Sequence, residues 1–212
     1  MQITFNHIKN SKKTVWDLGN RFLYELCEKN FTHTETEKII AKVWIIGRTY
    51  SVALERRKNK AENNDTFYKE NIVNVFKKSE IDNKMLTLKK SSQLVNENIG
   101  LIIETHKYLT DELKLLTEQE KRSFSSKYLH FHLPNLFYIY DSRASLALNK
   151  IFKKIPIEYE NLISKIEKDK VYSHFFLKCI MLEQKISKEF NINLSPRQID
   201  NLLIEIANKE ST

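Results

Sequence analysis

SFSSKYLHFHLPNLFYIYDSRASLAL, residues 123–148, is the stretch that decides how the middle of this chain folds. Apolar side chains at helical spacing predict a helix over residues 117–133. Pro134 ends this helix, because a proline disfavours helical backbone in the residue before it. The segment that follows, 135–140, is too apolar for a surface loop and is predicted to cross the interior. Asp141 is then predicted to begin a new helix, where a carboxylate caps free backbone N–H groups.

Lys127 lies among the apolar positions of the predicted 117–133 helix, where lysines are uncommon. Its aliphatic stem could carry the amine out to water. If the amine is instead half buried, desolvation lowers its pKa and makes it a better nucleophile. The sequence therefore places a candidate nucleophile, Lys127, and a helix-capping carboxylate, Asp141, at the two ends of one buried connection.

The remaining helices are predicted from apolar residues repeating every three or four positions. Thr34 with Glu37, and Thr117 with Glu120, have the spacing of capping boxes. The first twelve residues are expected to be a polar lead-in and residues 79–86 to be irregular. The nine predicted helices cover approximately residues 14–28, 37–58, 65–78, 88–116, 117–133, 141–153, 157–167, 172–190 and 197–208.

The composition favours an all-α fold. The chain has only three glycines and three prolines, with 41% hydrophobic and 29% charged residues. A chain with so few glycines and prolines can form few tight β-hairpins. The isolated glycines also exclude phosphate-binding loops of the P-loop and Rossmann types. We expect one all-α domain over residues 1–212, with a cleft between helical lobes 1–116 and 117–212.

The net charge of +8 favours polyanionic partners such as nucleic acid, and it does not distinguish DNA from RNA. The lysines could equally be spread over solvated faces. No apolar run approaches the roughly 18 residues of a membrane span, and the N-terminus has no signal-peptide core. These features predict a cytoplasmic protein without a membrane partner, and they leave its oligomeric state open.

No cofactor or metal is expected from the pattern of ligating residues. Cys27 and Cys179 are far apart in apolar helical patterns, which favours buried, reduced thiols. His130 and His132 are two positions apart, so on a helix they point roughly 200° apart and cannot chelate one ion. His106 stands alone on an apolar face and is predicted to be a core histidine.

A lysine-bearing helix, a buried connector and a helix-leading aspartate together resemble the helix-hairpin-helix DNA glycosylases, specifically their small OGG-fold-like bacterial branch. The resemblance is carried by residues 126–131 (SKYLHF), 140–143 (YDSR) and 195–200 (SPRQID), and covers about 117–206. It implies that Lys127 attacks the sugar C1′ to form a Schiff base and that Asp141 assists. The glycines that hold a DNA phosphate in that family are absent here.

Two further sets of candidate residues follow from the charge and from the resemblance. The candidate nucleic-acid contacts are Arg122, Ser123, Ser125, Ser126 and Arg143, together with Arg48, Arg56 and Arg57 from an earlier basic helix end. The candidate pocket for a flipped base consists of Tyr128, His130, Phe137, Tyr138 and Tyr140.

Two other function classes fit the same residues. A non-catalytic helical module that binds nucleic acid or protein, in a mobile-element or phage-defence setting, would keep salt-sensitive binding after Lys127→Ala. A helical ribonuclease toxin would place an arginine closely before a histidine on one helix. Arg122 and His130 have seven residues between them, a longer spacing than that arrangement uses.

Overall fold

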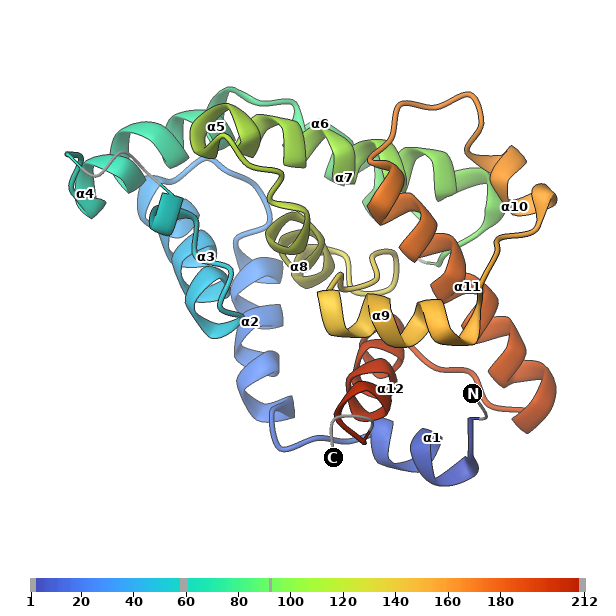
Figure 1. Ribbon diagram of the computed structural model, residues 1–212. Helices are drawn as coiled ribbons and strands as arrows, with labels where there is room; N and C mark the ends of the chain where they lie inside the picture. The colour runs from blue at the N-terminus through green and yellow to red at the C-terminus, as the bar shows by residue number, and fades with distance from the viewer. Residues whose placement is uncertain (1–2, 58–60, 92, 210–212) are drawn as a thin grey trace.

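The computed structural model describes residues 3–57, 61–91 and 93–209, and within these ranges the chain is helical without a strand (Figure 1). The predicted all-α fold is confirmed. The elements in chain order are α1 Phe5–Ser11, α2 Asp17–Lys29, α3 Thr36–Thr49, the 3-10 turn η1 Leu54–Arg57, α4 Asn64–Thr66, the π-helical segment η2 Phe67–Ile72, α5 Val73–Lys78, α6 Ile81–Lys89, α7 Asn96–Thr117, α8 Arg122–His132, α9 Ser142–Ile151, α10 Ile157–Leu162, α11 Lys170–Phe190 and α12 Pro196–Lys209.

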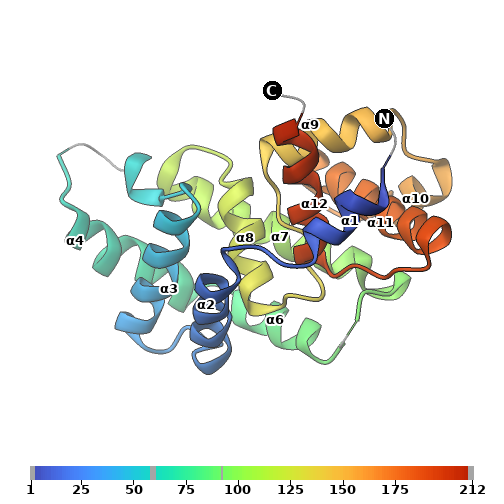
Figure 2. The same ribbon diagram turned by 90° about the horizontal axis from the view of Figure 1, so that it is seen from below.

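Helix α8 is the central element. Helices α2, α3 and α7 all pack against it, while α12 packs against α1, α9 and α11 (Figures 1 and 2). The buried apolar side chains form one cluster that reaches from Ile8 near the N-terminus to Ile206 near the C-terminus. The lysine-bearing helix and the connector after it therefore lie in the middle of the molecule. None of the described helices is long and apolar enough to cross a bilayer.

The predicted helix over residues 117–133 is shorter than expected at its start. Thr117 is the last residue of α7, and its hydroxyl donates to the Leu113 carbonyl, so the predicted capping box with Glu120 is wrong. The end is confirmed, because α8 stops at His132, two residues before Pro134. The turn between the two helices is made instead by Glu118 in a left-handed conformation, with φ of 54°.

The buried connector and the helix after it are confirmed. Residues 136–139 are all 2% exposed or less, and Tyr140 is half-buried. Asp141 is the N-cap of α9, and its side chain accepts a hydrogen bond of 2.9 Å from the backbone N–H of Arg143. Local signals were sufficient here, because both the proline stop and the aspartate cap act within one helical turn.

Two helices lie where the sequence predicted none. Helix α1 occupies part of the expected polar lead-in, because the Thr4 side chain accepts from the backbone N–H of His7 and Ile8 turns into the core. Helix α6 occupies the expected irregular segment, where Ile81, Met85 and Leu88 are fully buried at helical spacing. The predicted helix over 88–116 is therefore divided between α6 and α7.

Helix α3 ends at Thr49, although the apolar pattern continues to Leu54. The chain turns back at Ser51, which has a φ of 55°, and the backbone N–H of Val52 donates to the Gly47 carbonyl over 2.8 Å. A Cβ atom on Gly47 would meet the Cα of Ala53 at 3.1 Å. The glycine therefore permits the close approach of the returning backbone.

The apolar stripe predicted on the first helix is largely wrong. In α2 Leu23 and Cys27 are buried, but Val15 just before it is 89% exposed and Leu18 and Phe22 are also exposed. Neighbouring Trp16 is exposed as well, so apolar side chains gather on the outer side of this helix. Cys27 and Cys179 are both free and buried, as predicted.

The predicted helices near the C-terminus are confirmed, with shifted bounds. Asp169 caps α11 by accepting from the backbone N–H groups of Val171 and Tyr172. Ser195 precedes α12, and its hydroxyl accepts from the backbone N–H of Gln198 over 3.3 Å. Helix α10 is shorter than predicted and ends at Leu162.

Candidate functional site

The Lys127 amine is buried at the junction of α8 and the connector. The side chain is 3% exposed, and Nζ donates to Ser123 Oγ over 2.7 Å and to the Tyr140 carbonyl over 2.8 Å. Ser123 Oγ also donates to the same carbonyl over 3.0 Å. Because Tyr140 immediately precedes Asp141, these contacts hold the amine directly beside the start of α9.

The electrostatics of Lys127 are a balance between burial and two carboxylates. Burial lowers the pKa of Lys127, while the negative charges of Asp200 and Asp141 act to raise it. Asp141 is partly exposed, caps α9, and lies 3.7 Å from Arg143 Nε. It therefore acts on the amine through its charge, since no direct ion pair joins them in the described structure.

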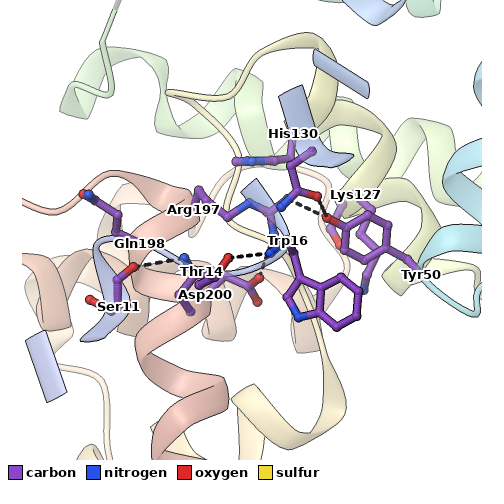
Figure 3. Close-up of polar contacts among 12 residues, drawn as sticks. Ser11, Thr14, Trp16, Tyr50, Lys127, His130, Arg197, Gln198 and Asp200 are labelled. Atoms are coloured by element: carbon purple, nitrogen blue, oxygen red, sulfur yellow. Dashed lines mark hydrogen bonds and ion pairs between the residues drawn. The ribbon is translucent and has the colours of Figure 1, made fainter. Parts of the chain in front are cut away.

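Helix α12 supplies two residues of the site that the sequence analysis did not assign. Arg197 Nη1 donates to Asp200 Oδ2 over 3.1 Å, and the two side chains face Lys127 and Tyr50 (Figure 3). Burial raises the pKa of Asp200, against the positive charges of Arg197 and Lys127. The signal in the sequence that could have identified them is an arginine and an aspartate three residues apart on the buried face of an amphipathic helix.

Arg197 also organises a chain of directed hydrogen bonds toward α8. Its Nε donates to the Tyr24 oxygen over 3.2 Å, so the Tyr24 hydroxyl donates in turn to His130 Nε2 over 2.7 Å. His130 Nδ1 then donates to the Phe137 carbonyl over 2.8 Å. Burial lowers the pKa of His130 to about 3. This histidine is therefore neutral, with both ring nitrogens occupied.

A second branch runs from Arg197 to α2 and α3. Arg197 Nη2 donates to the Tyr50 oxygen over 2.7 Å, and the Tyr50 hydroxyl donates to Asn20 Oδ1 over 2.6 Å. Burial raises the pKa of Tyr50 to about 12, so it stays protonated as this chain requires. The Lys127 amine lies 5.8 Å from the centre of the Tyr50 ring, within cation–π range.

One open pocket reaches this site. It has a volume of about 240 Å³ and lies between the turn after α3 and the start of α8. Its lining includes Ser123, whose hydroxyl binds the Lys127 amine, and two cations, Arg56 and Lys121. We call it the Ser123 pocket; it is completed by Ser51, Val52, Ala53, Glu120 and Phe124. The amine is thus one hydrogen bond away from a basic opening.

The predicted nucleic-acid contacts divide into interior and exposed groups. Ser126 donates to the Ser123 carbonyl and accepts from the Tyr140 N–H, while Ser125 is fully buried, with no hydrogen-bond partner for its hydroxyl in the described structure. Arg122 pairs with Asp169 over 2.6 Å and with Glu120. These residues tie the structure together, and of this group only Ser123 lines the pocket.

The predicted arginines of the earlier basic segment also differ from one another. Arg48 forms an ion pair of 2.5 Å with buried Glu55, across the turn rather than along one helix. Arg56 is exposed at the pocket. The side chain of Arg57 lies outside the described residues. On the other side of the connector, Arg143 is exposed on the first turn of α9.

The predicted base pocket is part of the hydrophobic core. Its side chains are buried apart from half-buried Tyr140, and none of them lines the Ser123 pocket. The Tyr128 hydroxyl lies 2.5 Å from His33 Nε2, and that of Tyr138 donates to Glu183 over 2.5 Å. In this conformation the aromatic rings stabilise the interior. The set comprises Tyr128, His130, Phe137, Tyr138 and Tyr140.

A second buried lysine provides a contrast. Lys42 is fully buried, and its amine donates to the Asn30 carbonyl over 2.6 Å and to His132 Nε2 over 3.2 Å. Burial lowers its pKa to about 8. It contacts carbonyls at the end of α2, which is a capping role. His132 is engaged here and His130 in the Arg197 chain, so the two point to different parts of the core.

The group of this site that can react is the Lys127 amine. Among the described residues, no group of three or more histidine, cysteine, aspartate or glutamate side chains could hold a metal ion. Arg122 and His130 have different partners and do not form a joint site. Comparison of the chain with protein-family models, curated proteins and solved structures finds no match.

Proposed function

We propose that the protein is a DNA-binding enzyme of the base-excision type, a DNA glycosylase with lyase activity in which Lys127 is the nucleophile. The observation that carries the proposal is the desolvated Lys127 amine, which feels the charges of Asp200 and Asp141 and lies one hydrogen bond from the basic Ser123 pocket. The net charge of +8 supports a polyanionic substrate. The resemblance of residues 126–131 and 140–143 to the glycosylase pattern supports the same reaction.

In this reaction the neutral amine attacks C1′ of the target nucleotide. A carbon–nitrogen bond forms to Lys127, the glycosidic bond breaks, and the base leaves with the bonding electrons and takes up a proton. Loss of the proton from the new ammonium and opening of the sugar ring give a Schiff base. A lowered pKa raises the neutral fraction of the amine. The charge of Asp141 would stabilise the positive charge that develops on the sugar.

Borohydride trapping tests the nucleophile. Wild-type protein should give a covalent adduct with duplex DNA from a panel containing uracil, oxidised purines and an abasic site. Lys127→Arg should give no adduct, because a guanidinium stays protonated and cannot act as the nucleophile. The substitution keeps the positive charge of the lysine. Lys121→Arg on the rim of the Ser123 pocket is the matched control and should trap as wild type does. An adduct formed equally by Lys127→Arg, or none from wild type over the panel, would refute the assignment.

The carboxylate beside α9 is tested separately. Asp141→Asn removes the charge but keeps a side-chain oxygen for the cap, since asparagine caps helices as well as aspartate does. We expect the melting temperature to stay within about 2 °C while the trapping rate falls by about 100-fold, as for loss of one electrostatic group in a site. An Asp141→Asn variant that traps at the wild-type rate would remove Asp141 from the mechanism.

A second candidate, a non-catalytic nucleic-acid-binding module, is favoured by one specific observation. The Lys127 amine already has two acceptors at 2.7 and 2.8 Å and is almost fully buried, which also suits a structural tie between α8 and the connector. This candidate predicts DNA binding whose affinity falls with salt. That binding should be unchanged in Lys127→Arg, with no adduct from either protein.

A further inference from the structure

A larger pocket lies across Arg197 from the lysine. It has a volume of about 360 Å³, within the usual range of roughly 300–1,000 Å³ for small-molecule sites. Four segments meet there: the end of α1, α2, the turn after α8, and the first turns of α12. We call it the α2–α12 pocket; it is lined by Lys12, Asp17, Asn20, Arg21, Tyr24, Pro134, Asn135, Ser195, Arg197, Gln198 and Asn201.

The charges around the α2–α12 pocket favour an anion. Arg197 is already paired with Asp200 over 3.1 Å. This leaves two cations, Lys12 and Arg21, to face one carboxylate, Asp17. That carboxylate is already satisfied, because it accepts from the backbone N–H of Thr14 over 2.9 Å and from the Thr14 hydroxyl over 2.8 Å. These bonds, the backbone one first, hold the pKa of Asp17 below its usual value. The exposed side chains of Lys12 and Arg21 have no partner among the described residues.

The directions of the hydrogen bonds show that the Asn20 side chain presents an N–H donor on the inner wall of the pocket. Arg197 can only donate, so the Tyr50 oxygen accepts from it and the Tyr50 hydroxyl must donate to Asn20. The acceptor atom of Asn20 is therefore its Oδ1. This leaves the Nδ2 group, on a side chain only 7% exposed that lines the pocket, without a partner among the described residues. This amide group is therefore a donor available to a ligand in the pocket.

Gln198 repeats the arrangement at the start of α12. Its Oε1 accepts from the backbone N–H of Ser195 over 2.9 Å, so its amide nitrogen also remains available as a donor. Gln198 and Tyr50 lie on opposite sides of Arg197 (Figure 3). Helix α12, whose N-terminus borders the pocket, has fourteen residues and adds a favourable dipole for an anion.

We propose that the α2–α12 pocket binds a phosphate group, carried either by a free nucleotide or by a nucleic-acid strand. Asn20 and Gln198 would donate to its oxygens from the inner wall, and Lys12 and Arg21 would neutralise it from the rim. The site is distinct from the Ser123 pocket and requires no reaction at Lys127. Its ligand chemistry follows from the excess of donors and cations, with no free carboxylate to oppose it.

Titrations of the full chain test the pocket, with inorganic phosphate, deoxyadenosine 5′-monophosphate and a single-stranded DNA 12-mer as probes. Ionic strength is kept constant with sodium chloride. Heteronuclear NMR should show shifts of the Asn20 and Gln198 side-chain amides, and calorimetry gives the affinity. The Lys12→Ala/Arg21→Ala double variant alters only exposed side chains and should weaken phosphate binding at least tenfold. The Lys90→Ala/Lys165→Ala double variant removes two exposed cations that line neither pocket and should bind as wild type does.

Each outcome of these titrations decides the proposal. Saturable binding of inorganic phosphate that depends on Lys12 and Arg21 supports it. Binding of the 12-mer but not the mononucleotide, with the same dependence, supports it and assigns the source to a strand. No amide shift with any probe, or equal loss in both double variants, overturns it. Lys127→Arg should leave the phosphate affinity unchanged, so a failed borohydride experiment and a failed phosphate titration are separable.

Discussion

Two helical glycines of this chain differ in what an added methyl group would meet. At Gly19 in α2 nothing lies within 4 Å of an ideal Cβ, whereas at Gly47 in α3 the Cβ would meet the Ala53 backbone at 3.1 Å. Gly19→Ala should therefore stabilise the fold by about 1 kcal/mol through helix propensity. Gly47→Ala should destabilise it by about 1 kcal/mol, because overpacking against backbone exceeds that gain.

Urea unfolding followed by circular dichroism measures both substitutions on the same scale. The comparison is matched, since each variant adds one methyl group to a helix. Equal stabilisation by the two variants would contradict the close approach at Gly47.

At the residue scale, the sequence predicts what depends on near neighbours and misses what depends on distant ones. Asp141 was predicted as a cap because its partner, the Arg143 N–H, is two positions away. Asp200 is 73 positions from Lys127 in the chain, and only the fold brings its charge to the amine. The exposed face of α2 shows the same limit, because nothing local to Val15 indicates that no other helix covers it.

At the element scale, helix α9 depends on one side chain at its start. Asp141→Ala removes the acceptor for the Arg143 N–H and should destabilise the protein by about 1 kcal/mol, the usual cost of losing a cap. Asp141→Asn should lower the free energy of unfolding by only a few tenths of a kcal/mol. Thermal and urea unfolding of the two variants provide the measurement, and an equal loss of stability in both would show that charge, not capping, matters at this position.

Element boundaries were predicted well where a breaker acts and poorly where packing decides. Pro134 and Ser195 mark a real end and a real start, because proline geometry and the Ser195 cap act within a few residues. The two predicted capping boxes are wrong, because the N-cap of α3 is Glu35 without a side-chain hydrogen bond, not Thr34, and Thr117 ends α7. Helix α3 ends before its apolar pattern does, because the chain can turn back over Gly47. Short α6 was missed because its three buried residues lie just before a longer apolar pattern that dominates any window spanning both.

For the whole molecule, buried neutral histidines predict a steep loss of stability in acid. Burial lowers the pKa of both His106 and His130 to about 3, from about 6.5 when unfolded. The unfolded chain therefore binds more protons below pH 6.5, and stability falls as pH falls from 6.5 toward 3. These two groups alone contribute a slope of about 2.7 kcal/mol per pH unit between pH 6 and 4, and His132, whose pKa burial also lowers well below its usual value, adds to it.

Urea midpoints measured at half-unit intervals of pH test this slope. His130→Gln should reduce the slope by about 1.4 kcal/mol per pH unit, because the variant has one fewer group to protonate, and its amide can still accept from Tyr24. A slope that stays unchanged in His130→Gln, or a wild-type midpoint that does not move between pH 6 and 4, would show that these histidines are accessible to protons in the folded state.

At the same scale, the all-α class was predictable from composition, but the location of the pockets was not. The Ser123 pocket and the α2–α12 pocket each join segments more than 60 residues apart in the chain, such as Ser51 with Ser123 and Lys12 with Ser195. Periodicity and capping describe one element at a time. They cannot predict how α2, α3 and α12 are arranged around α8.

Helix α12 provides Arg197 and Asp200, and it packs against α1 from the opposite end of the chain. During translation the ribosome must therefore release this last helix before the surroundings of Lys127 are complete. A nascent polypeptide halted before residue 196, or a product of a premature stop codon there, would present an amine without its arginine–aspartate neighbours. The charged surroundings of the Lys127 amine are thus assembled only after synthesis has passed α12.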